Sequence, residues 1–188
     1  MSLVAWGRAV KARRPGLPPL WLFTDPARTP DLLAALRALP RGLCGVVFRH
    51  DGVPGRTALL RQAARICRER RLLLVAAGRS RDVPAGVGRH LRGGAGPAGP
   101  RPSFVTSSAH NRADLVRARR AGARLAFLSP VFPTASHPGA RPLGPARWGK
   151  AARCTGLCVA ALGGVGGSEI RRLPRWTAGV GAIGALLP

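Results

Sequence analysis

Acidic residues are scarce in this chain, which has 7 Asp and Glu against 31 Lys and Arg among 188 residues and a formal net charge of +24. Tyrosine is absent, and only Lys11 and Lys150 are lysines, so arginine supplies nearly all of the positive charge. The arginines are scattered along the whole length instead of forming a basic tail, which indicates a compositional bias more than a nucleic-acid-binding segment. We therefore expect no nucleic-acid partner.

Long apolar runs are missing as well. No stretch approaches the roughly 20 apolar residues that span a bilayer, and residues 1–19 lack the apolar core of a secretory signal. Hydrophobic residues nevertheless make up 46% of the chain, which excludes a disordered protein. We expect a soluble, cytoplasmic protein without membrane contact, with one domain at residues 20–188 and a basic N-terminal extension at residues 1–19.

The four cysteines lack the CxxC spacing of zinc and redox motifs. Cys44 and Cys158 fall inside apolar runs that are typical of strands. This placement predicts buried thiols in a reducing compartment more than a disulfide or a metal site.

Short apolar runs bounded by turn signals recur about every two dozen residues. They predict eight strands, at residues 20–23, 44–48, 72–77, 86–91, 103–107, 123–128, 157–162 and 179–183. Helical spacing is found between several of them, at residues 32–39, 57–70 and 111–121, with Asp31 as the cap of the first helix. The Gly- and Pro-rich stretch 93–102 predicts a loop in place of a helix.

Neighbouring strand-like runs have no hairpin-turn dipeptide between them, so we expect parallel strands connected by crossovers. Eight parallel strands close most economically as an α/β fold of the (β/α)8 TIM-barrel type. At 188 residues this barrel would be compact, with some helices shortened or missing. An open doubly wound sheet is the alternative, but Thr24-Asp25-Pro26-Ala27 after the first run offers no glycine fingerprint for it.

In a (β/α)8 barrel the functional groups lie in the loops after the strands, and phosphate is commonly bound after strands seven and eight. Gly163 and Gly164 follow the seventh predicted strand, and Gly184 follows the eighth. Because glycine lets backbone N–H groups approach an anion, both loops suit a phosphate. A sequence with 25 glycines also places some of them at any turn, and this alternative stays open.

Five segments carry a resemblance to a known family. They are WLFTD at residues 21–25, VVFR at 46–49, FVTSSAHN at 104–111, AGARLAFLSPVFPT at 121–134 and VAALGGV at 159–165. In this order and spacing they resemble the thiamine phosphate synthase and thiazole tautomerase family over residues 20–187. The resemblance implies a (β/α)8 barrel enzyme that joins hydroxymethylpyrimidine pyrophosphate to thiazole phosphate with the help of Mg²⁺. Its partners would be these two small phosphorylated substrates.

The resemblance also implies roles for individual residues. Catalytic roles fall on Arg49, Ser108 and His110. Substrate and phosphate binding falls on Arg49, Ser108, Thr134, Ser136, His137, Gly163, Gly164 and Gly184. An arginine fork pairs two oxygens of a diphosphate, and a histidine moves a proton near neutral pH. From the residues alone, Arg49 could equally be one solvated arginine among many, and Ser108, Thr134 or His110 could only bond the start of a helix.

The chain departs from the family where Mg²⁺ would bind. The Asn-Asp pair that the family has after the third strand falls at Ala77 and Gly78, and the acid after the fourth falls near residues 94–95. Asp51, where the family has a lysine, is a weak candidate for a replacement ligand. These losses favour, as the second function, the metal-independent thiazole tautomerase, in which His110 would move the proton.

A third alternative is a non-catalytic barrel that binds thiamine precursors or RNA through its arginines. The densest basic stretch, residues 57–71, lacks interleaved aromatic residues, which indicates a solvated helix face instead. The short ending after the last strand predicts a thin outer wall on that side of the barrel. A homodimer that covers this wall is a hypothesis.

Overall fold

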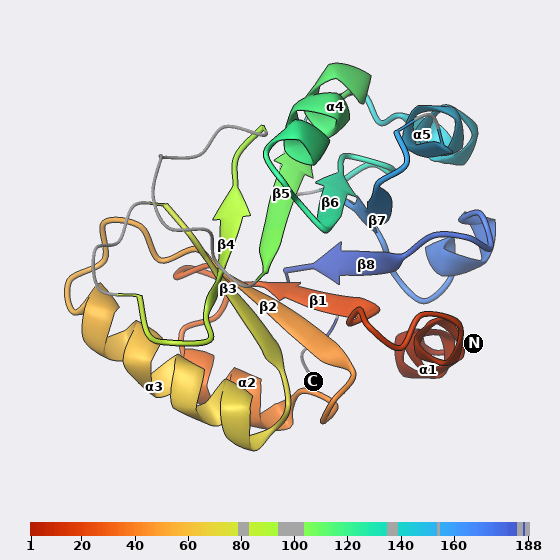
Figure 1. Ribbon diagram of the computed structural model, residues 1–188. Coiled ribbons are helices and arrows are strands. Elements are labelled where there is room, and N and C mark those ends of the chain that lie inside the picture. Colours follow the sequence, from red (N-terminus) through yellow and green to blue (C-terminus); the bar gives the residue numbers. More distant parts are fainter. Residues whose placement is uncertain (79–82, 94–103, 135–138, 154, 184–185, 187–188) are drawn as a thin grey trace.

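The computed structural model describes residues 1–78, 83–93, 104–134, 139–153, 155–183 and 186, and its strands form a closed barrel in the order β1 to β8 (Figure 1). Every neighbouring pair, including β1 and β8, is parallel. The strands are β1 Leu20–Phe23, β2 Cys44–Phe48, β3 Leu73–Ala77, β4 Gly88–Leu91, β5 Val105–Ala109, β6 Leu125–Leu128, β7 Cys158–Leu162 and β8 Gly179–Ala182. The predicted (β/α)8 barrel is confirmed.

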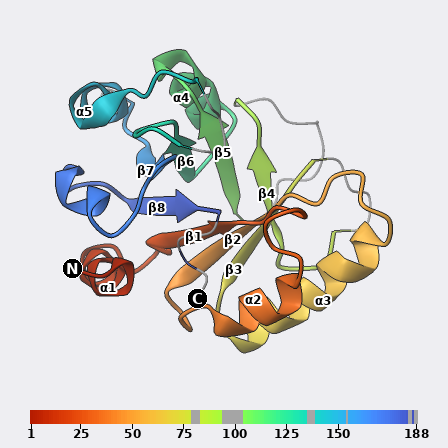
Figure 2. The ribbon, with the colours of Figure 1, turned by 180° about the vertical axis from the view of Figure 1, so that it is seen from behind.

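Helices surround this barrel. They are α1 Leu3–Arg13, α2 Leu32–Ala38, α3 Arg56–Glu69, α4 Arg112–Arg120, α5 Gly144–Arg153 and the short 3₁₀ helix η1 Glu169–Arg172. Figures 1 and 2 show α2 and α3 side by side along one flank, with α4 and α5 on the opposite flank. No helix in the described part of the chain is long and apolar enough to cross a membrane.

Side-chain caps stabilise the first turns of two helices that begin at the mouth of the barrel. The Asp31 carboxylate accepts a hydrogen bond from the Ala34 N–H at 2.9 Å, which confirms the predicted cap of α2. The Asn111 side chain accepts one from the Asp114 N–H at 2.9 Å and starts α4 directly after β5. The chain therefore turns from the end of β5 into α4 at His110, the residue that precedes the cap.

Large and small residues alternate inside the barrel. Trp21 is fully buried and pairs in register with Gly45 on one side and Gly181 on the other. A Cβ atom on Gly45 would lie 2.5 Å from the Trp21 ring, and one on Gly181 would lie 2.8 Å from the Phe23 ring. Phe127 meets both rings edge-on, with centroids 5.2 Å and 4.7 Å away. These aromatic rings fill the barrel below the mouth.

Residues 1–19, expected only as a basic extension, contain helix α1. Its Trp6 and Val10 are buried in the core cluster outside the sheet, and Gly7 packs against Leu20 of β1. Arg13 and Arg14 donate to backbone carbonyls in the segment before β8, those of Arg175 and Trp176. Helix α1 therefore packs against the start of β1 and the segment before β8, and the homodimer that would cover the wall after β8 stays a hypothesis.

The cysteines partly match their expected state. Cys44 and Cys67 are buried free thiols, and burial raises the pKa of each to about 12. Cys158 is also free but only half-buried, with its sulfur 3.6 Å from the Arg14 guanidinium, so its predicted burial is wrong. Cys154 lies outside the described residues.

Candidate active site

A cavity of about 500 Å³ opens at the carboxyl ends of the strands. Five residues predicted for the site line it, namely Arg49, His110, Thr134, Gly163 and Gly164. They follow β2, β5, β6 and β7, so the barrel brings together residues that are more than 100 positions apart. The cavity also has lining residues that the sequence did not single out, among them Arg28, Ser129 and Glu169.

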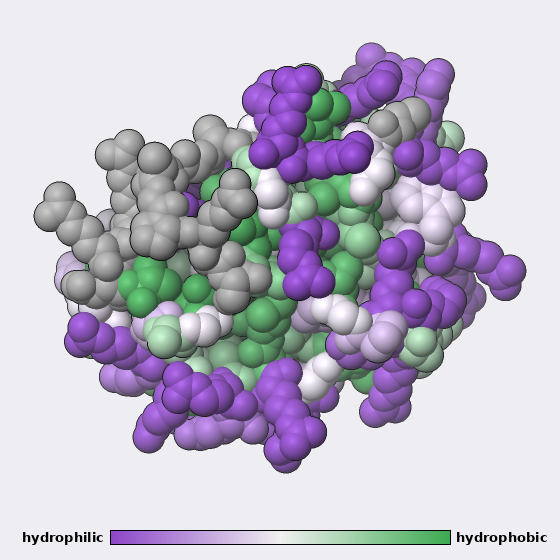
Figure 3. Space-filling model, in the orientation of Figure 1, coloured by the Kyte–Doolittle hydropathy of each residue, from purple (hydrophilic) through white to green (hydrophobic). Residues whose placement is uncertain are grey.

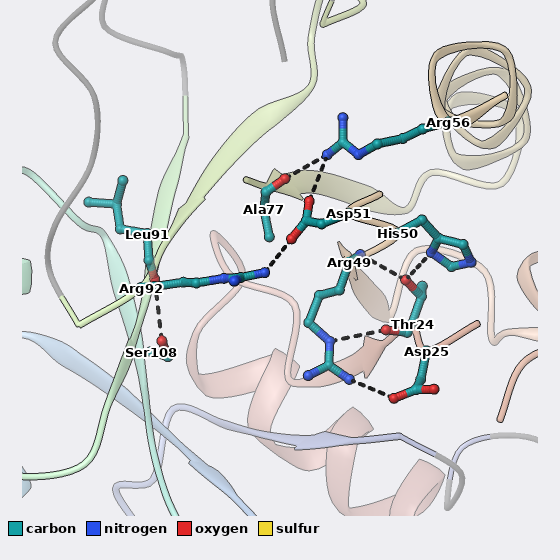
Figure 4. A network of polar contacts seen from close by, with 10 residues as sticks. All are labelled: Thr24, Asp25, Arg49, His50, Asp51, Arg56, Ala77, Leu91, Arg92 and Ser108. Atoms are coloured by element: carbon teal, nitrogen blue, oxygen red, sulfur yellow. Dashed lines mark hydrogen bonds and ion pairs between the residues drawn. The ribbon is translucent and has the colours of Figure 1, made fainter. Parts of the chain in front are cut away.

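Arg49 is oriented by the two residues that follow β1 (Figure 4). Its Nε donates to the Thr24 carbonyl at 3.0 Å, and its Nη2 lies 3.7 Å from the Asp25 carboxylate. The Thr24 hydroxyl accepts from the Arg49 backbone N–H at 2.9 Å and lies 3.0 Å from His50 Nδ1. Burial lowers the pKa of Arg49 and Asp25 opposes this effect, yet the guanidinium stays charged. The cavity thus holds a fixed cation at the end of β2.

His110 is held at the start of α4. Its backbone N–H donates to the buried Asp114 carboxylate at 2.7 Å. Its Nδ1 lies 3.1 Å from the Ser129 carbonyl oxygen and, at the longer distance of 3.4 Å, from the Ser129 hydroxyl. Because a carbonyl oxygen can only accept, Nδ1 carries the proton in the neutral ring. Nε2 is then the basic nitrogen that can take a proton from a ligand in the cavity.

The loop after β7 has space for backbone only. Gly163 and Gly164 adopt φ values of +90° and +63°, and a Cβ atom on Gly164 would lie 2.2 Å from the Pro133 carbonyl oxygen. The Phe132 N–H donates to the Gly163 carbonyl at 3.1 Å, so the loop after β6 is bonded to the loop after β7. This contact brings Thr134 beside the two glycines, as the phosphate-site prediction requires.

A carboxylate lies next to this glycine loop. Glu169 accepts from the Gly166 N–H at 3.2 Å and from the Ser168 hydroxyl at 2.8 Å. The hydrogen bond from Ser168 is the main cause of a lowered pKa for Glu169, which therefore stays negative. An anionic ligand in the cavity must share the loop with this charge.

Ser108 lies at the same end of the barrel but is not among the residues that line the cavity. Its hydroxyl lies 3.4 Å from both the Leu91 carbonyl oxygen and the Gly93 backbone nitrogen, so it points toward the end of β4. Its predicted position beside Arg49 and the glycines is therefore not what the structure has. Ser136, His137 and Gly184, also predicted for the site, lie outside the described residues.

The residues at the ends of β2 and β3 do not fit Mg²⁺. Asp51, the weak candidate ligand, has its two oxygens next to Arg56 Nη2, at 3.5 Å, and Arg92 Nη2. The third strand ends in Ala77 and Gly78, which bring no carboxylate. Among the described residues there is no group of three His, Cys, Asp or Glu side chains that could hold a metal ion. The Asp51 carboxylate, which a metal ion would need as a ligand, is already paired with two guanidinium groups.

The fold and the cavity together define a (β/α)8 barrel with an arginine, a histidine and a glycine loop gathered at the carboxyl ends of its strands. The family model described as thiamine monophosphate synthase matches residues 20–185. The chain belongs to this family, which has a role in thiamine biosynthesis.

One solved structure agrees with the fold. A thiamine phosphate pyrophosphorylase from Pyrococcus furiosus superposes with a TM-score of 0.74 and 21% sequence identity, over 88% of this chain and 85% of that chain. A structure described as native KDPGal is 12% identical with a TM-score of 0.46, over 89% of this chain and 82% of that chain. A search of curated protein sequences returned no match.

Proposed function

We propose that this protein is a thiamine phosphate synthase, which joins hydroxymethylpyrimidine diphosphate to thiazole phosphate. The observation that carries the proposal is the meeting of Arg49, Thr134 and the glycines 163 and 164 at one cavity, in a chain of this family. Thiazole phosphate would bind the glycine loop and Thr134 through backbone N–H groups and a hydroxyl. Arg49 would pair with the diphosphate of the second substrate.

The reaction depends on the positioning of the two substrates more than on general acid or base catalysis. The thiazole nitrogen donates its electron pair to the pyrimidine methylene carbon, and the bond from that carbon to the diphosphate oxygen breaks with its pair going to oxygen. The diphosphate therefore gains negative charge in the transition state. A guanidinium already fixed by Thr24 and Asp25 stabilises this charge without reorganising.

A coupling assay that measures pyrophosphate release from the two precursors tests the proposal. Arg49→Met should lower kcat/KM by about a hundredfold or more, as expected when a preorganised donor is removed. The matched control is Arg70→Met, because Arg70 is also half-buried and donates to a backbone carbonyl, that of Leu39 at 2.7 Å, but on the outside of the barrel. Equal activity of the two variants would contradict the role of Arg49, and no pyrophosphate release by the wild type would contradict the reaction.

The second candidate is the thiazole tautomerase, and the observation that favours it is the His110 ring. With Nδ1 bonded to the Ser129 carbonyl, Nε2 can remove a proton from one atom of thiazole carboxylate phosphate and return it to another. This activity should persist in EDTA and be lost in His110→Gln. The wild-type protein separates the two enzymes, because the synthase releases pyrophosphate from the two precursors and the tautomerase does not. A non-catalytic barrel would give neither activity.

A further inference from the structure

We infer that the edge of the mouth formed by β2, β3 and β4 binds a diphosphate through arginine side chains, with Arg92 in the place where the family uses a divalent metal. The inference rests on the proposed function, because that function supplies the diphosphate. It concerns Arg92, which is not part of the sequence motifs and is not among the residues that line the cavity.

The first observation is the location of the Asp51 carboxylate. A Cβ atom built on Gly78 would lie 2.2 Å from Asp51 Oδ1, so this carboxylate occupies the volume of a side chain at position 78. The resemblance aligns position 78 with a family acid at the end of β3. A carboxylate is therefore present at that place, but it comes from the end of β2.

The second observation is that this carboxylate is bridged on both sides. Asp51 Oδ1 lies 3.5 Å from Arg56 Nη2, and Oδ2 pairs with Arg92 Nη2. Arg56 is itself fixed, because its Nη2 donates to the Ala77 carbonyl at 2.6 Å and its side chain is only 13% exposed. A metal ion would have to displace a guanidinium from the carboxylate, and the remaining positive charge would oppose the exchange.

The third observation is the sign of the charge at this edge. Three guanidinium groups, on Arg49, Arg56 and Arg92, face two carboxylates, on Asp25 and Asp51 (Figure 4). The excess is positive, which attracts a diphosphate and repels a divalent cation.

Arg92 is the most exposed of these three arginines. Its side chain is 67% exposed, and it extends from the end of β4 past β3 to Asp51, near Arg49 (Figure 4). A guanidinium has five N–H donors in a planar fork, so one nitrogen can keep the bond to Asp51 while another holds phosphoryl oxygens. When the bond to the pyrimidine methylene breaks, Arg92 would neutralise the electron pair that the diphosphate oxygen gains.

Calorimetric titration with inorganic pyrophosphate tests the inference on the full chain. In EDTA and in excess Mg²⁺ the wild type should bind pyrophosphate with affinities that agree within about twofold, because the counter-charge comes from protein. Arg92→Met should weaken binding by about tenfold or more in both buffers, the loss expected for one charge-assisted contact. Arg65→Met is the matched control, since Arg65 is 70% exposed and paired with one carboxylate, Glu69, on α3, and it should bind like the wild type.

Asp51→Asn should change the affinity for pyrophosphate in opposite directions at an arginine site and at a metal site. If Asp51 only bridges arginines, its loss releases positive charge, and pyrophosphate should bind as well as or better than in the wild type. If Asp51 is a metal ligand, Mg²⁺ should strengthen wild-type binding by about tenfold or more and Asp51→Asn should lose this gain. That result would overturn the inference, and so would unchanged binding in Arg92→Met or no binding of pyrophosphate by the wild type.

The binding readout keeps this inference apart from the proposed reaction. Metal-independent pyrophosphate binding that needs Arg92, in a protein that couples no precursors, would support the arginine site and refute the synthase. Coupling that requires Mg²⁺ and is unchanged in Arg92→Met would support the synthase and refute the arginine site.

Discussion

His90 makes the stability of the barrel sensitive to acid. Its ring lies inside the barrel, 5% exposed, with centroids 5.7 Å from Phe23 and 5.9 Å from Phe127, and its Nδ1 lies 2.8 Å from the Thr106 hydroxyl. Burial, and then the positive charge of Arg49 and of Arg92, lower the pKa of His90 from 6.5 to about 3. The ring is therefore neutral in the folded protein throughout the physiological range.

The lowered pKa sets the direction and the size of the effect. Between pH 6.5 and about pH 3 the unfolded chain binds a proton at His90 that the folded chain excludes, so stability falls as the pH falls through this window. Linkage between these two pKa values gives a loss of about 2 kcal/mol from roughly pH 7.5 to roughly pH 5. Above roughly pH 7.5 the contribution is constant.

Urea unfolding of the wild type and His90→Gln at both pH values measures this loss. The variant should be less stable than the wild type near neutral pH, because it loses aromatic packing, but its stability should fall by about 2 kcal/mol less on acidification. The pKa of His50 is also lowered, by burial and by Arg56, and this contribution is common to both proteins and cancels in the difference. Equal acid losses in the two proteins would refute the buried neutral ring.

Two further substitutions test the barrel and the cavity. Gly45→Ala would place a methyl group 2.5 Å from the fully buried Trp21 ring, and denaturant unfolding should show a loss of about 1–3 kcal/mol, whereas Gly16→Ala, with open space around its Cβ, should be neutral. Glu169→Gln removes the negative charge beside the glycine loop, and phosphate should bind about two- to fivefold more tightly by calorimetry, the effect of one exposed charge. Glu69→Gln, on α3, should leave phosphate binding unchanged, and an equal gain there would contradict a local effect of Glu169.

The sequence is most informative about the strands, because every strand of a closed parallel barrel is buried on both faces and reads as an apolar run. The predicted ranges 44–48 and 123–128 overlap β2 and β6 almost completely. Helices α1 and α5 were not predicted. Both contain glycine and several basic residues, and each buries only a narrow apolar stripe, Trp6 and Val10 in α1 and Trp148 and Ala152 in α5.

Some of the residues that line the cavity could be predicted from the sequence, and others could not. Arg49 and His110 carry a sequence signal because each directly follows a strand in a motif, and Thr134 because it lies in the motif after β6; the barrel geometry then gathers them. Arg28 had no signal among so many arginines, since only the path of the loop after β1 brings it to the cavity. Glu169 did have a sequence signal, since an acid beside a glycine loop is conspicuous in a chain with 7 acidic residues, but it was not among the predicted residues.

The scarcity of acids also explains why an arginine site is the natural anion site in this protein. Figure 3 shows hydrophilic side chains along the top, the right and the bottom of one face of the molecule, so they are spread around it instead of forming one patch. Four of the described acids pair with arginine, namely Asp25, Asp51, Glu69 and Asp114. Asp31 caps α2 and Glu169 bonds the glycine loop. Every described carboxylate is thus engaged, and a metal site would need several of them released among competing guanidinium groups. A diphosphate needs only guanidinium and backbone N–H groups, which the mouth of this barrel supplies at Arg49, Arg92 and the loop after β7.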